Sequence, residues 1–408
     1  MHPKHYELLI SLLSQPTAPF REEHVSAVAA RVLTAAGVPF FDDPLGNLVI
    51  GADSPAAYQR LLQTPGTDPL RVFIAHMDHP GFHGVRWLNE RVLTIKWHGG
   101  SPVKHLNGAR VWLAAGKPLL RFPHVRHPRR SDAEGAIGEG VLRRVTLNTL
   151  RYGIDTAEVH CTHDLFAAHR PAADELFGGF KFRKPVWKSG SLLYTKAADD
   201  LVGVFCIVAT ALAAFGKRNA KTPPPFIGLL TRGEEVGFIG AIGHFELGWL
   251  QAARRPLLCV SLEASRTLPG AVVGQGPVVR LGDRRTLFDS GATQLLTELA
   301  EKILPQQFQR RVMDGGTCEG TAATAFGFPT IALTVPLGNY HNQGFEGGPD
   351  CRAPHGPAPE FVHLDDVEGQ RKLCLALLRG KLAWADPWKK VRTRLKDNYR
   401  NYRNHLEK

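Results

Sequence analysis

The sequence has few of the features that mark membrane-spanning, secreted or disulfide-stabilised proteins. No apolar run reaches the roughly 20 residues of a membrane helix, and the residues after Met1 lack the apolar segment and cleavage site of a signal peptide. The six cysteines are scattered without a C-x-x-C pair, so neither a zinc knuckle nor a disulfide scaffold is expected. We therefore expect a cytoplasmic protein with reduced thiols and no membrane partner.

Acidic residues are the minority, with 38 Asp and Glu against 50 Lys and Arg and a formal net charge of +12. Much of the positive charge lies in residues 124–130 and in the tail from residue 386 onward. Tyr399 and Tyr402 interleave with the basic residues of the tail, a mixture that can bind single-stranded nucleic acid. No nucleic-acid-binding motif accompanies it, so we interpret both segments as solvated charge, in a surface loop and a C-terminal helix.

Two patterns of hydrophobicity alternate along the chain. Before residue 84, helical apolar spacing is interrupted by Pro16 and Pro19 and followed by an apolar strand at 72–75. Residues 85–188 contain short β-like runs between Gly and Pro turns, with no amphipathic helix. From residue 201 strands and helices alternate again, with strands at 226–230, 257–262 and 330–335 and helices at 202–215, from 238, and at 293–303.

This pattern predicts an α/β fold with a largely parallel sheet covered by helices on both faces, in three layers, and a small inserted β-barrel-like domain. The main domain would comprise residues 1–84 and 189–385. The insert would comprise residues 85–188, and residues 386–408 would form the basic tail.

Imidazole and carboxylate side chains follow five separate strands. In such sheets the carboxyl ends of the strands meet at one edge, where ligands bind. Two histidines and several acids fall there, which is the ligand set of divalent cations. The residues concerned are His76, Asp199, Glu234, Glu235, Glu263 and His341.

Carboxylates crowded together repel one another unless cations compensate them. Two cations can share a carboxylate and a water, and can stabilise the oxyanion formed when a peptide carbonyl is attacked. Of the adjacent pair Glu234 and Glu235, one would be a ligand and the other would transfer the proton of the water. Asp78 would hold His76 in one tautomer.

Taken in order, these motifs resemble the glutamyl/deblocking aminopeptidases, metallo-aminopeptidases with two metals that often assemble as tetrahedral dodecamers. The resemblance begins at residues 43–47 and extends to about residue 378. The matching motifs are His76-Met77-Asp78, Lys196-Ala197-Ala198-Asp199-Asp200, Glu234-Glu235-Val236-Gly237, Gly315-Gly316-Thr317 and His341.

The resemblance implies a zinc-exopeptidase (phosphorylase/hydrolase-like) domain that removes amino-terminal residues from short peptides. His76 and Glu263 would complete one metal site, Glu235 and His341 the other, and Asp199 would bridge both. Glu234 would be the general base. We expect two zinc ions, with cobalt or manganese as alternatives, a homo-oligomer, and a cis peptide bond between Asp199 and Asp200.

The sequence departs from the family pattern at three places, and the first two lie where substrate recognition is expected. Cys318 replaces an aspartate after the Gly-Gly-Thr motif, the segment before His341 lacks an arginine and is one residue shorter, and Leu201 replaces an arginine. Glu319 is our candidate for binding the ammonium group of a substrate, and Tyr340 a second substrate-contacting residue.

Two other functions are compatible with the same residues. A carboxypeptidase or N-acyl amino acid deacylase would need a basic residue for the substrate carboxylate, for which Arg266 or Arg280 could serve, although either is expected to be surface charge. A non-catalytic, metal-stabilised protein could instead contact an anionic partner through its basic tail.

Overall fold

The computed structural model describes all residues except 117–135, 151, 163–170, 217–222, 380–381 and 407–408. The predicted basic segment 124–130 therefore lies outside the described residues. Among the described residues, no helix has the length and apolar character needed to cross a membrane.

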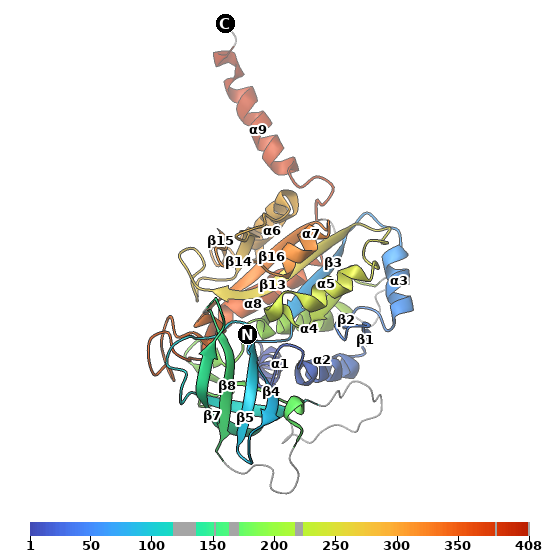
Figure 1. Ribbon diagram of the computed structural model, residues 1–408. Coiled ribbons are helices and arrows are strands. Elements are labelled where there is room, and N and C mark those ends of the chain that lie inside the picture. Colours follow the sequence, from blue (N-terminus) through green and yellow to red (C-terminus); the bar gives the residue numbers. More distant parts are fainter. Residues whose placement is uncertain (117–135, 151, 163–170, 217–222, 380–381, 407–408) are drawn as a thin grey trace.

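The main domain is built around an 11-stranded sheet (Figure 1). Its centre consists of four parallel strands in the order β12 (Phe226–Thr231), β3 (Leu70–His76), β13 (Leu257–Arg266) and β16 (Thr330–Gly338). All seven residues of β3 are buried, as expected for a strand covered on both faces.

The expectation of a largely parallel sheet is wrong for the outer strands. Each of them pairs antiparallel with the strands next to it in the sheet. Two of these pairs, within residues 40–50 and 186–195, are hairpins joined by short turns, whereas the other pairs join strands that are distant in the sequence. These strands are β1 (Phe40–Asp42), β2 (Leu48–Ile50), β17 (Glu360–His363), β11 (Leu192–Thr195) and β10 (Val186–Ser189). Two further strands, β14 (Val278–Gly282) and β15 (Gln309–Val312), extend the sheet beside β16.

Helices cover both faces of the sheet and bury two separate cores. The two-residue period of β3 places Phe73 and Ala75 in one core, Val72 and Ile74 in the other. The first core is covered by α1 (Pro3–Leu13), α2 (Glu23–Ala36), α4 (Leu201–Phe215), α6 (Ser290–Ile303) and α8 (Leu364–Leu377). The second is covered by α3 (Pro55–Gln63), α5 (Ile239–Glu246) and α7 (Glu319–Ala325). The predicted three-layer arrangement is confirmed.

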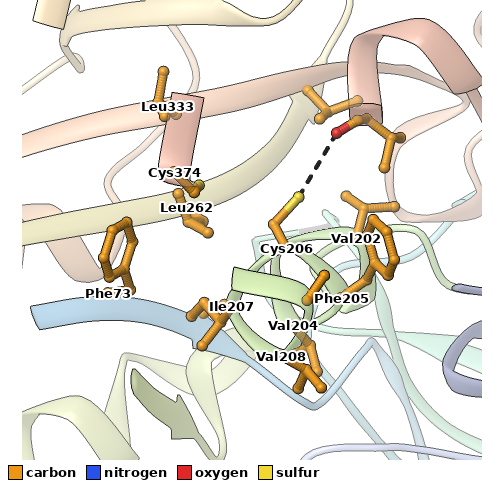
Figure 2. Close-up of a cluster of buried hydrophobic side chains, with 14 of the residues drawn as sticks. Phe73, Val202, Val204, Phe205, Cys206, Ile207, Val208, Leu262, Leu333 and Cys374 are labelled. Atoms are coloured by element: carbon orange, nitrogen blue, oxygen red, sulfur yellow. Dashed lines mark hydrogen bonds between the residues drawn. The ribbon is translucent and has the colours of Figure 1, made fainter. Parts of the chain in front are cut away.

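Helix α4 is the most deeply buried helix that bears on the site. Its first eleven residues are all buried, and Figure 2 shows its side chains beside Phe73 of β3, Leu262 of β13 and Leu333 of β16. The thiol of Cys206 donates to the carbonyl oxygen of Val367 in α8, at 3.8 Å. This packing fixes the amino end of α4, which follows Asp199 and Asp200.

The insert forms a closed barrel with its own apolar core. Its strands run in the order β4 (Gly81–Trp87), β5 (Val92–His98), β8 (Ile154–Cys161), β7 (Ala136–Leu147), β6 (Arg110–Ala115) and β9 (Leu176–Phe180). The barrel leaves the main domain just after β3 and returns to it before β10, so it lies next to the carboxyl end of β3 (Figure 1).

The basic tail forms a helix, α9 (Lys389–Tyr402), followed by a short 3-10 turn, η6 (Arg403–His405). No residue of either element is buried. In Figure 1 the helix extends away from the rest of the molecule, at the end opposite the barrel.

Candidate metal centre

The predicted ligands come from five segments that end at one edge of the sheet. His76 is the last residue of β3, and Glu263 lies near the end of β13. Glu235 lies in the 3-10 turn η4 (Glu234–Val236) after β12, and His341 in the turn η5 (Tyr340–Asn342) after β16. Asp199 precedes α4, and its peptide bond with Asp200 is cis, as expected from the resemblance.

Asp199 lies between the two histidines. Its Oδ1 atom is 3.4 Å from Nε2 of His76, and its Oδ2 atom is 3.7 Å from Nε2 of His341. Nε2 of His341 is also 3.1 Å from Oε2 of Glu235. In each of the two groups His76–Asp199–Glu263 and Asp199–Glu235–His341, one potential ligand atom per residue lies within 4.8 Å of the others. The structure thus brings all five predicted ligands together.

Several oxygen atoms in these groups are buried without any hydrogen-bond donor. They are Oδ1 of Asp199, Oε1 of Glu235 and Oε1 of Glu263. A buried carboxylate oxygen without a partner is costly, and most such atoms in native proteins are hydrogen-bonded or bind a cation. The donor set of imidazole nitrogens and carboxylate oxygens therefore fits divalent metal ions.

The crowding of acids is visible in the pKa values of the site. Burial raises the pKa of Glu263 to about 8, although Arg280 and His76 oppose the shift. Burial also raises the pKa of Glu234 well above its usual value. For His76 burial acts in the opposite direction, but the carboxylates of Glu234 and Asp199 raise its pKa well above the usual range. Bound dications would relieve this accumulation of negative charge.

Asp78 orients the site in a different way from the one expected. Nδ1 of His76 lies 3.1 Å from the backbone carbonyl oxygen of Asp78, which can only accept, so Nδ1 carries the proton and Nε2 is left as a ligand atom. The Asp78 carboxylate is 3.6 Å from that nitrogen. Instead it accepts hydrogen bonds from the backbone N–H groups of Glu234 and Glu235, at 3.0 and 3.1 Å.

Glu360, which sequence reasoning missed, has a similar positioning role. From β17 its buried carboxylate accepts hydrogen bonds from the backbone N–H groups of Ala198, Asp199 and His341, at 2.6, 3.2 and 2.8 Å. It therefore ties the Asp199 segment to the His341 turn. His79 adds a further constraint, because its Nδ1 atom donates to the backbone oxygen of Asp199 at 2.9 Å.

The barrel contributes a close backbone contact to His341. A Cβ atom built on Gly100, in the loop after β5, would lie 2.3 Å from Nδ1 of His341. Only glycine permits this approach of the loop to the imidazole ring. The insert therefore forms part of the wall of the metal centre.

A cleft of about 660 Å³ opens beside the predicted ligands. Asp199, Glu234, Glu263, Tyr340 and Arg280 are among the residues that line it. The Tyr340 ring is stacked on the His341 ring, with 3.7 Å between their centroids.

Two residues considered for substrate binding, Glu319 and Arg280, lie in surroundings that differ from those expected from the sequence. Glu319, at the start of α7, is completely buried and is not among the lining residues of the cleft; burial raises its pKa to about 7. Arg280 was expected at the surface, but its exposed fraction is 2%. Its Nε atom has no hydrogen-bond partner, whereas its Nη1 atom donates to the Ser265 hydroxyl at 3.4 Å and its Nη2 atom lies 4.0 Å from the carboxylate of Asp283.

Known proteins resemble the chain in sequence and in fold. Residues 180–345 match a family described as M42 glutamyl aminopeptidase. The matched segment contains Asp199, Glu235, Glu263 and His341, four of the five predicted ligands. A comparison with curated proteins gives no match.

Solved structures of this type share the fold over most of the chain. The TET1 peptidase of Pyrococcus horikoshii, described as assembling into a tetrahedron or an octahedral shell, is 19% identical, with a TM-score of 0.65 and coverage of 92% of this chain and 99% of that one. A TET aminopeptidase from a marine sediment thaumarchaeon is 18% identical with the same TM-score, covering 94% and 99%. An aminopeptidase from Desulfurococcus kamchatkensis is 19% identical, again at 0.65, covering 93% and 96%.

At these sequence identities the solved structures establish the fold alone. The evidence for a peptidase comes from the match of residues 180–345 to the family. The resemblance predicted from the motifs is confirmed by both comparisons. Residues 180–345 are therefore similar to the M42 glutamyl aminopeptidases, and this likeness supports a metal-dependent aminopeptidase.

Proposed function

We propose that the protein removes amino-terminal residues from short peptides with the help of two divalent cations. His76, Asp199 and Glu263 would hold one, and Asp199, Glu235 and His341 the other. The observation that carries this proposal is the position of Asp199, whose two carboxylate oxygens each face a different histidine. Such a pair of cations would lower the pKa of a water molecule and neutralise negative charge on the carbonyl oxygen under attack.

The proton transfer is assigned to Glu234. Its carboxylate lines the cleft, its Oε2 atom lies 3.8 Å from Nε2 of His76, and its backbone is held by Asp78. In this position Glu234 would accept the proton of the attacking water and deliver it to the leaving amine. The fixed backbone keeps the carboxylate oriented through both steps.

Substrate contacts are assigned to the cleft. Tyr340 is available there for the peptide, whereas Glu319 is completely buried and does not line the cleft, which does not suit direct contact with an ammonium group. Arg280 offers an unpaired donor to a substrate carboxylate, which would be an acidic first side chain or the carboxyl end of a very short peptide. We propose a preference for such substrates.

The metal and the assembly are finer points of the same proposal. Mixed imidazole and carboxylate ligands suit zinc, with cobalt and manganese as alternatives. The dodecamers, tetrahedra and octahedral shells described for the TET peptidases support a homo-oligomer here too.

Hydrolysis of amino-acid anilides tests the proposal. We expect activity to be lost on chelation and restored by zinc, cobalt or manganese, and Glu234→Gln to lower kcat by about 10²–10⁴-fold. Glu246→Gln, an exposed acid on α5, is the matched control and should be neutral. Activity that withstands a chelator, or an undiminished Glu234→Gln variant, would refute the mechanism.

The Arg280 assignment has a separate test. Replacement by methionine should raise KM for glutamyl anilides and for dipeptides, and leave KM for longer peptides with neutral first residues nearly unchanged. An equal loss on all substrates would assign Arg280 to balancing the charge of Glu263 instead.

A further inference from the structure

The basic tail presents an apolar stripe that nothing in the described part of the chain covers. On an α-helix of 3.6 residues per turn, Trp388, Val391, Leu395, Tyr399 and Tyr402 fall within an arc of about 80°. Four of the five are exposed, with exposed fractions of 41% for Trp388 and 57–66% for Leu395, Tyr399 and Tyr402. The family match ends at residue 345, so the stripe lies outside the matched segment.

Positive charge borders this stripe on both sides. Between Trp388 and Leu406 there are seven Lys and Arg residues and one acid, Asp397, so this short segment carries half of the chain's net charge of +12. At 100° per residue, Arg392 and Arg403 flank one edge of the stripe and Arg394 lies toward the other. Three of the basic residues are paired with acids: Lys390 with Glu298 at 2.5 Å and Arg392 with Asp386 at the base of the helix, and Arg400 with Asp397 at 3.1 Å.

We propose that α9 binds the surface of a membrane that contains anionic lipids. A helix with aromatic and aliphatic residues along one face and Lys and Arg beside them lies in the plane of the interface, with its apolar face about 5–10 Å deep. Tyr and Trp are suited to the boundary between headgroups and acyl chains, and long basic side chains reach the phosphate groups from there. The chain would attach to the surface without crossing the bilayer.

This proposal departs from the expectation of no membrane partner, which rested on the lack of a spanning segment. Surface attachment requires only one exposed amphipathic helix, and α9, about 21 Å long at 1.5 Å per residue, extends away from the molecule (Figure 1). The body of the protein would not obstruct its contact with a flat surface.

Two other partners fit the helix less well. Nucleic acid would pair with the charge but would leave Leu395 and Val391 in water, because contact with phosphates buries no aliphatic surface. The tail of a second copy would cover the stripe, but it would bring the same excess of positive charge to within a helix diameter. A membrane with anionic lipids would both bury the apolar stripe and pair with the positive charge.

Flotation of the full-length protein with vesicles tests the proposal. We expect binding to vesicles of phosphatidylcholine mixed with phosphatidylglycerol, and much weaker binding to phosphatidylcholine alone. The variant Leu395→Asn/Tyr402→Asn, which keeps the charge, should lower the partition coefficient at least about tenfold. Arg394→Gln/Arg403→Gln, which keeps the stripe and removes one charge from each side of it, should lower the partition coefficient on anionic vesicles and reduce its dependence on salt. Thr393→Asn, on the opposite face, is the control.

Tryptophan fluorescence gives a second reading. Vesicles should shift the emission of the wild-type protein to shorter wavelength, and the Trp388→Phe variant should lose this shift. Because α9 contributes nothing to the proposed metal centre, anilide hydrolysis should be unchanged in all these variants, which shows that they are folded.

Three outcomes would overturn the proposal. The first is absence of flotation, or flotation that the stripe variant leaves unchanged. The second is binding to a single-stranded RNA oligonucleotide without binding to vesicles. The third is a change in the mass of the assembly in the stripe variant without any vesicle binding, which would assign the stripe to a second copy.

Discussion

Replacement of Asp199 by asparagine should weaken the binding of both cations at once. The substitution keeps the shape of the side chain but removes the one charge that both proposed ligand groups share. Glu263, in contrast, belongs to only one of the two ligand groups, the one that contains His76. Glu263→Gln is therefore the matched comparison, because it removes one charge from one proposed site.

The size of the effect follows from the distances in the site. The two Asp199 oxygens lie 3.4 and 3.7 Å from the imidazole nitrogens that would share the cations. At about 4 Å and an effective dielectric constant of about 20, a pair of unit charges is worth about 4 kcal/mol, or about three powers of ten in affinity. Allowing for the neighbouring carboxylates that remain, we expect both dissociation constants to rise by about 10²–10³-fold.

Calorimetric titration of the metal-free protein with zinc measures both constants. The wild type should bind two ions per chain, Glu263→Gln should keep one of them near its original affinity, and Asp199→Asn should keep neither. The metal-free Asp199→Asn protein should also unfold at a higher temperature than the metal-free wild type, because Asp199 raises the pKa of Glu263 and Glu360 by repulsion. One ion retained at full affinity in Asp199→Asn would refute the shared position of this residue.

Three further predictions concern the surroundings of the site. Glu360→Gln should raise both metal dissociation constants by about 10–100-fold, with unchanged affinities as the contrary result in the same titration. Gly100→Ala should selectively lose the ion assigned to His341, since the added methyl group meets that ring at 2.3 Å, and a crystal structure should show the ring displaced. Burial lowers the pKa of His83 to about 4. The unfolded chain therefore binds a proton at this residue near pH 6.5, whereas the folded chain binds it only near pH 4. The free energy of unfolding should fall as the pH drops through this window. The urea midpoint at pH 7 and pH 5 measures this, and His83→Gln should lose less than the wild type.

The ligands could be predicted from the sequence because one geometric rule governs them. Parallel strands in a covered sheet are continuous apolar runs, so the region where each one ends can be located, although β13 and β16 continue to Arg266 and Gly338, beyond the predicted ends at 262 and 335. Polar residues near these ends converge at one edge of the sheet. His76 is the last residue of one such strand, and Glu263 lies near the end of another. The antiparallel pairing of the outer strands was not predicted, because strands as short as β17 carry too short a pattern to indicate their partners or direction.

Hydrogen bonds between a side chain and backbone groups distant in the sequence could not be predicted in the same way. Glu360 reaches the N–H groups of residues about 160 positions earlier in the chain, and nothing in its local sequence distinguishes it from a surface acid. The burial of Arg280 is a similar case. Position 280 lies on a short strand at the side of the sheet, and its environment is set by the cleft rather than by its neighbours in sequence.

Hydrogen bonding divides the acids of this region into two sets that burial alone does not separate. The carboxylates of Glu22, Asp78 and Glu360 are as deeply buried as the proposed ligands, but each accepts hydrogen bonds from backbone N–H groups of the loops that carry those ligands. Asp199 and Glu263 each keep a carboxylate oxygen without any donor. A buried carboxylate is tolerable only when its charge is compensated. The first set is compensated by the fold itself and holds the loops in place, and the second set is left for cations to compensate, so metal binding and the final ordering of this edge of the sheet should be one process.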